Sequence, residues 1–344
     1  MAKIEGLTKC SWHKLLVPRG LRNVPCIVVL GYHDVVPPGR VRSWLQVDAD
    51  NLARQLRFCQ KLGTFLHPDV LLDPDRVRRD RLNFLLTFDD GYANIKQVAF
   101  PVLQRLQIPF LVFVSTHNMV TGEPFWFDTI VALLQQYRVE EIDLRSLGLK
   151  KYLFPAGAAG RRWDAIQVLL EDIKWSARGL QDEAGRKVAD ALVNQLAAQG
   201  ISVQVESSAP LSAADVREMQ ASGLCAFGSH GHRHNIFTAL AEHQLQFEVT
   251  HSRAILEDVV QTRVETIAYP NGNADQRVRN ACRSAGYRLG FAVAADPSCP
   301  EDDRWFDIPR HLVGGYDATP RFMLDLGRFV CGGNTFQVAL PTSR

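Results

Sequence analysis

Two short motifs carry the residues that could do chemistry. TFDDGY occupies residues 87–92 and SHGHRH occupies residues 229–234, and each motif ends an apolar run. Adjacent carboxylates and two histidines four residues apart are suitable ligands for a divalent metal, with one acid left free. A bound ion would lower the pKa of its water and polarise a carbonyl oxygen, while the free carboxylate accepted a proton. The two motifs together predict a hydrolase.

Each motif also has a simpler interpretation. Asp90 could cap a helix that starts near Tyr92, and the spacing of His230 and His234 also occurs by chance. We expect His232 to point away from the pair. One carboxylate and two histidines would leave positions open for water and substrate. Zn²⁺ fits this set best, and Co²⁺, Ni²⁺ or Mn²⁺ would also bind.

The composition is that of an ordinary globular chain. Its 344 residues are 46% hydrophobic and 22% charged, which allows one large α/β domain or two small ones. The formal net charge of +2 gives no reason to expect nucleic acid as a partner. No run approaches the ~20 apolar residues of a membrane span.

The cysteines and the N-terminal residues bear on the compartment. Seven cysteines are irregularly spaced and include no Cys-x-x-Cys pair, which indicates reduced thiols. Residues 1–20 contain no apolar run long enough for a signal peptide. We therefore expect a cytoplasmic protein.

Short apolar runs alternate with helical patterns along the first third of the chain. Strands are expected at 26–30, 83–88 and 110–114. A helix is expected between an N-cap at Asp50 and Gly63, and another to about Leu106. Continuously apolar strands separated by helices are typical of a parallel sheet that is covered on both faces. In such folds the functional residues gather at the C-terminal ends of the strands.

The pattern changes between residues 125 and 214. Helical stretches appear at 165–173 and 185–198 with no strong strand, which predicts a helical insertion over about 130–210. Further strands are expected at 223–229, 266–269, 290–294 and 306–308. The predicted organisation is therefore an N-terminal arm (1–24), an α/β barrel (25–330) that carries the insertion, and a loose tail (331–344).

Three motifs together resemble a known family. TFDDGY, GSHGHRH and IAYPNG, the last at residues 267–272, are similar to those of the polysaccharide deacetylases with a NodB-homology domain, a type of carbohydrate esterase. The resemblance runs from about Ile27 to Val313. It implies a distorted (β/α) barrel of about seven strands and metal-dependent removal of an acetyl group, expected to be N-acetyl, from a sugar.

The resemblance also implies roles for individual residues. By position, Asp89 is the catalytic base. Asp90, His230 and His234 are the metal ligands. The backbone N–H of Asn271 lies where a developing oxyanion would be stabilised, which is a strong electrostatic contribution in such sites.

The chain departs from the family pattern after the second metal histidine and at the start of the third motif. Asn235 replaces a proline, and Ala268 replaces an arginine that braces the base. Arg310 is our candidate to take over that brace.

The histidine that protonates the leaving amine has no clear C-terminal match. Some members look circularly permuted and supply this residue from a Tyr-His pair on the first strand, as Tyr32-His33 does here. His33 is therefore the expected general acid, with Asp34 as a weaker candidate to orient it. His311 is the alternative general acid.

Aromatic residues near the motifs are candidates for binding substrate. Tyr92, Trp126 and Tyr269 are expected to contact the sugar. Trp126 and its neighbours Phe125 and Phe127 could equally belong to the core, because pockets and cores both use aromatics.

The expected substrate is an acetylated sugar or polysaccharide precursor, lipid-linked or nucleotide-linked, in surface or exopolysaccharide biosynthesis. The insertion would cap the site or dock a synthase or membrane enzyme. Two alternatives remain open: a hydrolase of small non-sugar amides or imides, and a non-catalytic carbohydrate-binding relative.

Overall fold

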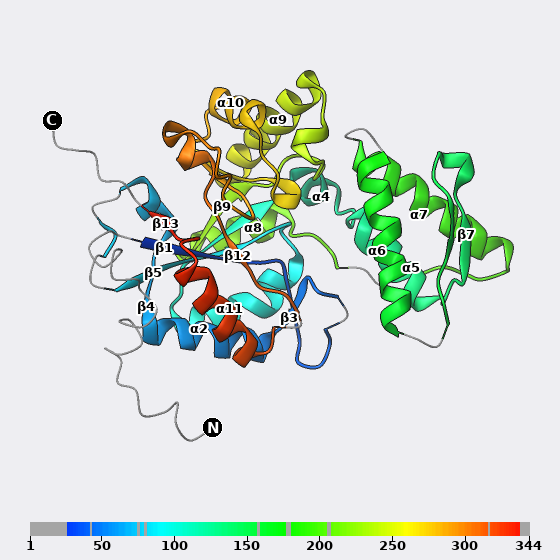
Figure 1. Ribbon diagram of the computed structural model, residues 1–344, viewed down its shortest axis with the longest axis horizontal. Helices are drawn as coiled ribbons and strands as arrows, with labels where there is room; N and C mark the ends of the chain where they lie inside the picture. The colour runs from blue at the N-terminus through cyan, green and yellow to red at the C-terminus, as the bar shows by residue number, and fades with distance from the viewer. Residues whose placement is uncertain are drawn as a thin grey trace.

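A curled parallel sheet organises the protein (Figure 1). The structure is a computed structural model that describes residues 26–41, 43–73, 76–78, 81–156, 159–176, 180–204, 208–315 and 317–337. The strand order is β11-β10-β9-β6-β5-β1-β12, and every neighbouring pair along this path is parallel. The expected distorted (β/α) barrel is confirmed.

The strands of this path match the apolar runs of the sequence except for β12, where no strand was expected. Their bounds are β1 Cys26–Tyr32, β5 Leu82–Phe88, β6 Phe110–Val114, β9 Cys225–Ser229, β10 Thr266–Ala268, β11 Leu289–Phe291 and β12 His311–Leu312. β4 (Gly63–Phe65) pairs parallel to β5, and β13 (Phe336–Gln337) pairs antiparallel to β1. β2 (Asp34–Val36) and β3 (Gln46–Asp48) form a separate parallel pair.

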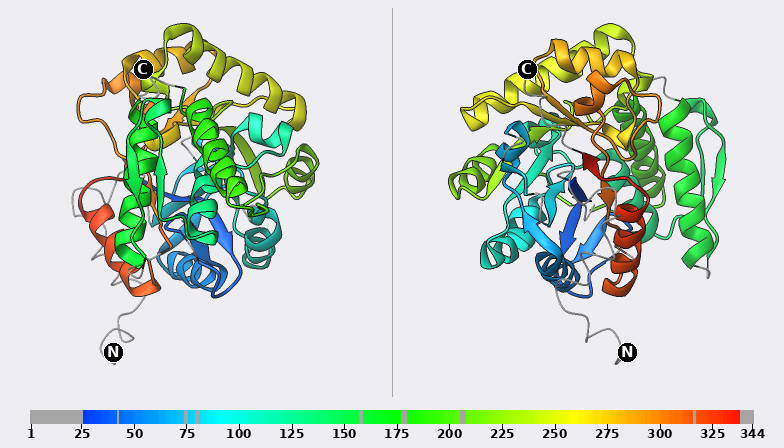
Figure 2. Two further views of the ribbon diagram at one scale, coloured as in Figure 1. Left: turned by 90° about the vertical axis from the view of Figure 1, so that its right-hand side faces the viewer. Right: turned by 60° about the vertical axis from the view of Figure 1, so that its left-hand side comes forward.

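Helices cover the outside of the curled sheet (Figure 2). They are α2 Ala49–Leu62, α3 Phe100–Leu106, α8 Ala213–Ala221, α9 Glu242–Val260, α10 Gln276–Ser284 and α11 Thr319–Cys331, with a short α4 at Thr116–Thr121. The predicted N-cap at Asp50 is wrong by two residues. The side chain of Asp48 accepts the backbone N–H groups of Asp50 and Asn51, so Asp48 is the cap.

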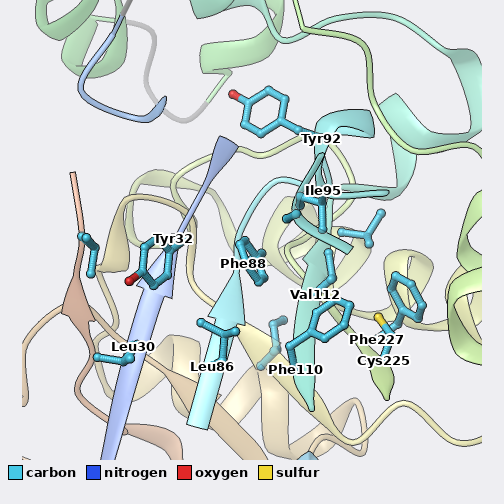
Figure 3. Close-up of a cluster of buried hydrophobic side chains, with 14 of the residues drawn as sticks. Leu30, Tyr32, Leu86, Phe88, Tyr92, Ile95, Phe110, Val112, Cys225 and Phe227 are labelled. Carbon is cyan, nitrogen blue, oxygen red and sulfur yellow. The ribbon is translucent and has the colours of Figure 1, made fainter. Parts of the chain in front are cut away.

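The strands are apolar on both faces because both faces are buried. Alternate residues point to opposite sides of a strand. Leu30 and Tyr32 of β1 lie beside Leu86 and Phe88 of β5 in the cluster that packs under the outer helices (Figure 3). The residues between them, such as Leu85, belong to a second cluster inside the curl of the sheet.

Two sequence expectations near the C-terminus differ from the structure. The strand expected at 306–308 is instead a 3₁₀ helix, Glu301–Phe306, followed by a single bridge between Ile308 and Phe291. The acidic residues in the first turn of this segment, and its small number of apolar residues, favour a helical turn over a strand. Within the expected tail, 336–337 pair with β1, while residues 338–344 and the arm 1–24 lie outside the described residues.

A second lobe stands beside the barrel in Figure 1. It contains α5 Trp126–Gln136, β7 Glu141–Asp143, β8 Lys151–Leu153, α6 Ala159–Ser176 and α7 Gln181–Ala198. Its buried residues form their own cluster, separate from the clusters of the barrel. The segment is helical as expected, but it also has the short β7–β8 hairpin, which is too brief to give a strong alternating pattern. No described helix combines the length and apolar content needed to cross a bilayer.

Close packing of α7 on α5 predicts a sensitive glycine. A Cβ added at Gly185 would lie 2.2 Å from the ring of Trp126. Gly185→Ala should therefore lower the free energy of unfolding by about 1–3 kcal/mol, as overpacking does. Urea titration followed by circular dichroism measures the change. The control is Gly160→Ala, at an exposed position of α6 where an added Cβ would have no atom within 4 Å. It should change the free energy of unfolding by less than about 1 kcal/mol. Equal effects of the two variants would contradict the packing argument.

Candidate active site

The residues singled out in the sequence come from several strand ends. Because the strands of the path are parallel, their C-terminal ends share one edge of the sheet. One cavity of about 410 Å³ at this edge brings together most of the predicted residues, namely His33, Asp89, Asp90, Trp126, His230, His234, Tyr269, Asn271 and Arg310.

Asp90, His230 and His234 form a compact group. Their ligand atoms all lie within 4.8 Å of one another. Asp90 Oδ1 is 3.5 Å from His230 Nε2 and 3.2 Å from His234 Nε2. His230 Nδ1 lies 2.9 Å from the carbonyl oxygen of Ala268. That contact leaves Nε2 facing the carboxylate, the arrangement that orients a metal-binding imidazole.

The donor set fits a divalent ion. Asp90 Oδ1 is buried and has no hydrogen-bond partner within the described part of the chain. A buried carboxylate oxygen without a donor is costly, and a cation at this point would satisfy it. One carboxylate with two imidazoles is also a donor set that zinc and similar metals accept.

The backbone at this group is strained. Asp90, His234 and Asn271 have φ values of 70°, 56° and 60°, a region that non-glycine residues seldom occupy. Such strain concentrates at functional sites. Asp90 does not act as a helix cap, because its side chain faces the histidines and the following π-helical turn begins after Asn94. His230 and His234 lie on a loop, not on one face of a helix.

Asp89 has a different partner. Arg310 Nη1 lies 2.5 Å from Asp89 Oδ1, and both side chains are almost fully buried. The Arg310 Nε–H also donates to the carbonyl oxygen of Ala292. Burial alone would raise the pKa of Asp89, but the positive charge of Arg310, helped by His230 and His33, holds that pKa below its usual value. Asp89 is therefore ionised with one oxygen occupied by Arg310.

The pKa values of Asp90 and His230 follow from burial and contact. Burial opposes ionisation of Asp90, but the interaction with His234, whose Nε2 lies 3.2 Å from Asp90 Oδ1, lowers the pKa of Asp90 well below the usual range. Burial lowers the pKa of His230 to about 4. This imidazole is thus neutral near pH 7, the state in which it can bind a metal.

The two candidate general acids differ in position. His33 lines the cavity, and its Nε2 is 3.9 Å from Asp89 Oδ2. His311 does not line the cavity and packs its ring against Phe322 and Phe329. Asp34 Oδ2 accepts hydrogen bonds from Gln46 and Ser208, and within the described ranges neither Asp34 Oδ1 nor His33 Nδ1 has a hydrogen-bond partner, so Asp34 does not hold the His33 ring.

The predicted substrate-binding aromatics are more deeply buried than expected. Tyr92 does not line the cavity; its hydroxyl donates to Asp128, which does. Tyr92 follows the strand end and turns into the core beneath the cavity wall. Trp126 and Tyr269 line the cavity, yet both are buried, and the Tyr269 hydroxyl donates to the carbonyl oxygen of Phe306.

Other aromatic and charged residues reach the cavity without having been predicted. Trp44 is 39% exposed and packs edge-on against His33. Asp128 is flanked by Asp90 and Asp34, and burial together with these charges raises its pKa to about 8. No pattern in the sequence pointed to Trp44, while Asp128 directly follows the aromatic residues 125–127 and was not assigned a role.

One face of α6 forms the opposite wall of the cavity. The lining residues from this helix are Trp163, Gln167, Leu170, Glu171 and Lys174, which recur at the spacing of a single helical face. The adjoining face, with Ile166, Leu169 and Ile173, enters the core of the second lobe. Lys174 Nζ contacts Glu171 Oε1 at 2.8 Å and lies 3.4 Å from Asn271 Oδ1.

A buried glutamate holds the histidine loop. Glu248 Oε2 accepts the backbone N–H groups of His232 and Arg233, and its Oε1 accepts from the side chain of Asn235. The ring of His232 points away from Asp90, His230 and His234, and its Nδ1 lies 2.9 Å from Thr116 Oγ1. Glu248 lies on α9, outside the motifs, and was not predicted.

Comparison with known proteins completes the identification. Residues 77–290 match the family model described as polysaccharide deacetylase. The chain belongs to the polysaccharide deacetylase family. Its activity class is accordingly that of a hydrolase that removes acetyl groups from carbohydrate. No curated protein matches the chain.

Solved structures agree in fold. IcaB from Ammonifex degensii is 21% identical, with 88% of this chain and 97% of that chain covered and a TM-score of 0.54. The deacetylase PplD from Streptococcus pyogenes is 15% identical, with 88% and 99% covered and a TM-score of 0.54. A polysaccharide deacetylase from Bacillus cereus is 17% identical, with 88% and 69% covered and the same TM-score, 0.54.

The Asp89–Arg310 pair makes a testable prediction about stability. Arg310→Met should lower the free energy of unfolding by about 3–5 kcal/mol, because it leaves a buried carboxylate unpaired. Adding Asp89→Asn should recover part of this loss. Since the pKa of Asp89 is depressed in the folded protein, the pair stabilises above about pH 4 and its contribution disappears as the pH falls. Urea titrations at several pH values measure both effects.

The control uses an exposed ion pair. Arg145→Met removes the partner of Asp143, a pair whose side chains are 73% and 44% exposed, and should change stability little. An Arg310→Met effect no larger than that of Arg145→Met would contradict the argument.

Proposed function

We propose that the protein is a metal-dependent deacetylase that hydrolyses N-acetyl groups on a sugar, with Asp90, His230 and His234 as metal ligands. The observation that supports it best is the buried Asp90 oxygen without a donor, 3.2 Å from His234 and 3.5 Å from His230, beside an ionised Asp89. Family membership supplies the reaction class. Zinc is the proposed metal because the donor set has one oxygen and two nitrogens.

Asp89 is the proposed base. Its Oδ1 is held by Arg310, so Oδ2 faces His33 and remains available to accept a proton from the attacking water. Bound in this group, a divalent ion would lower the pKa of water and polarise the acetyl carbonyl. Arg310 acts as a positioning residue, since it fixes the carboxylate and keeps it ionised.

Two further groups complete the proposal. The backbone N–H of Asn271, on the strained turn after β10, would donate to the developing oxyanion. His33 would give a proton to the leaving amine, because it lines the cavity near Asp89 while His311 does not. Trp44, Trp126 and Trp163 give the cavity the aromatic surface that suits the faces of a sugar.

The biological setting is also a proposal. The family acts on acetylated polysaccharide, which supports a role in surface or exopolysaccharide biosynthesis. Cys59, Cys225 and Cys282 are buried thiols that form no disulfide, which supports a reducing, cytoplasmic compartment. We retain the domain layout of a barrel over 25–330 with an insertion at about 130–210. The separate core of the second lobe supports that layout, and the lobe is a candidate docking surface for biosynthetic partners.

The decisive experiment is acetate release from N-acetylated sugars before chelation, after chelation and after zinc is added back. Wild-type activity should disappear on chelation and return when zinc is added back. Asp89→Asn should keep the metal, as measured by elemental analysis, and lose about 10²–10⁴-fold in kcat/KM. His234→Ala should lose the metal as well as the activity. Bound metal without acetate release from any sugar would favour a small-amide hydrolase or a non-catalytic binder.

The general acid is tested by a matched pair of histidine variants. His33→Gln should lower kcat by about 10²-fold or more and remove the fall in rate at high pH, because the proton donor is gone. His311→Gln, on a ring packed away from the cavity, should have a much smaller effect. The pH–rate profile of each variant distinguishes the two roles. A larger loss with His311→Gln would transfer the assignment to His311.

A further inference from the structure

The second lobe reaches the candidate active site through the C-terminal end of α6. Lys174 lies in the last turn of this helix and lines the cavity, and its Nζ is 3.4 Å from the side-chain Oδ1 of Asn271. Asn271 belongs to the turn after β10, and its backbone N–H is the proposed oxyanion donor. The second lobe therefore contacts the barrel at the residue that has this proposed role.

The backbone of Lys174 is anchored to the barrel independently of its side chain. The carbonyl oxygen of Lys174 accepts a hydrogen bond from the side-chain amide of Gln181 at 3.1 Å. The oxygen of the same amide accepts the backbone N–H of Ile236 at 3.2 Å, in the loop that carries His234. Gln181 is 1% exposed, so this bridge is shielded from water. The point from which the Lys174 side chain starts is thus fixed relative to the barrel.

A further pair of contacts restrains the ammonium group. Lys174 Nζ also lies 2.8 Å from Glu171 Oε1, and the other oxygen of Glu171 accepts the Nε1–H of Trp175 at 3.0 Å. The Lys174 side chain is 26% exposed, compared with 58% for Lys187, which pairs with Glu183 on α7. Ordering a free lysine costs side-chain entropy. Because Glu171 already restricts Lys174, the contact with the barrel requires little further ordering.

The turn at Asn271 has a conformation that needs support. The φ of Asn271 is 60°, in the left-handed region that non-glycine residues seldom occupy. Its Nδ2 donates to Asn273 Oδ1 at 2.5 Å, while its Oδ1 faces Lys174. The next residue, Gly272, packs closely on Val293, since an added Cβ would lie 2.1 Å from Val293 Cγ2. The turn is therefore held by Asn273 and Val293 of the barrel and by Lys174 of the second lobe.

The direction of the Asn271 N–H determines what this turn can do. A backbone donor stabilises an oxyanion only when it points at the position where the charge develops. A small displacement of such a group reduces the rate severely. A contact that fixes the side chain of Asn271 from the second lobe also restricts the peptide plane that carries the donor.

We propose that Lys174 is a positioning residue for this oxyanion donor, so that the second lobe completes the active site as well as covering it. The inference rests on the proposed deacetylase function. It gives the insertion a role in turnover, exerted through Asn271, that is separate from the docking of a partner protein.

Removal of the ammonium group tests this role. Lys174→Met keeps the apolar part of the side chain but cannot donate to Asn271. With an N-acetylated glucosamine oligomer as substrate, kcat for acetate release should fall about tenfold, while KM should change less than about threefold, because the donor acts on the transition state. The loss should stay below the 10²–10³-fold expected when an oxyanion donor is removed outright.

Two further lysine variants accompany this measurement. Lys174→Arg retains a cationic donor and should restore kcat to within about threefold of wild type. Lys187→Met breaks a lysine–glutamate pair on α7 that does not line the cavity, and it should leave kcat and KM unchanged. An unchanged kcat in Lys174→Met would overturn the inference.

A double-mutant cycle separates positioning from direct contact with substrate, because Lys174 itself lines the cavity. Asn271→Gly keeps a residue that adopts a φ of 60° without strain, but it removes the side chain that the lysine holds. If Lys174 acts through Asn271, Lys174→Met should lower kcat less than about twofold in the Asn271→Gly protein. A full tenfold loss in that background would overturn the inference and assign Lys174 to the substrate.

Hydrogen exchange separates this inference from the proposed function. Mass spectrometry of the metal-free protein can follow the backbone amides of residues 266–275 without turnover. Exchange there should be about threefold faster or more in Lys174→Met and unchanged in Lys187→Met. Faster exchange without acetate release from any sugar would keep Lys174 as the restraint on the turn and reject the deacetylase. Acetate release with both kcat and exchange unchanged in Lys174→Met would keep the deacetylase and overturn the positioning role.

Discussion

The structure depends on the burial of two adjacent carboxylates at the end of β5. Asp89 and Asp90 are only 3% and 2% exposed, and removing such charges from water costs several kcal/mol each unless partners replace the solvent. The partners come from distant parts of the chain: Arg310 from the position just before β12, and the histidines from the loop after β9. The curled parallel sheet is what brings these segments to one edge.

The two carboxylates are compensated differently, and this difference separates their proposed roles. Asp89 faces a guanidinium, which remains charged at any accessible pH. Asp90 faces imidazoles, and burial lowers the pKa of His230 to about 4, so this partner is neutral near pH 7. Asp90 also retains a buried oxygen without a donor. A permanently paired carboxylate suits proton transfer, while a carboxylate that has an oxygen without a donor beside the neutral His230 suits the binding of a cation.

The sequence was sufficient where a property is local and insufficient where it depends on packing between distant segments. Strands such as Phe110–Val114 were predictable because both faces are buried, and Asp89 and Asp90 because they end such a strand. Arg310 could be suggested once Ala268 was seen to lack a guanidinium. Other features could not be predicted from the sequence. The inward turn of Tyr92 and the contacts of Glu248 with the histidine loop depend on tertiary packing. The cavity face of α6 was missed because helical periodicity alone does not say which polar face meets another lobe.

The substitution of Asn235 for proline becomes intelligible in this setting. Proline has no side-chain donor or acceptor, whereas Asn235 donates to Glu248 and accepts the backbone N–H of Asp182 at the start of α7. Arg233 reaches the carboxylate of Asp182 on the same helix, and Gln181 accepts the backbone N–H of Ile236. The loop that carries His234 is therefore fastened both to α9 of the barrel and to the second lobe. Since the lobe has its own core and also supplies the α6 wall of the cavity, the same few hydrogen bonds tie the placement of the lobe to the position of His234.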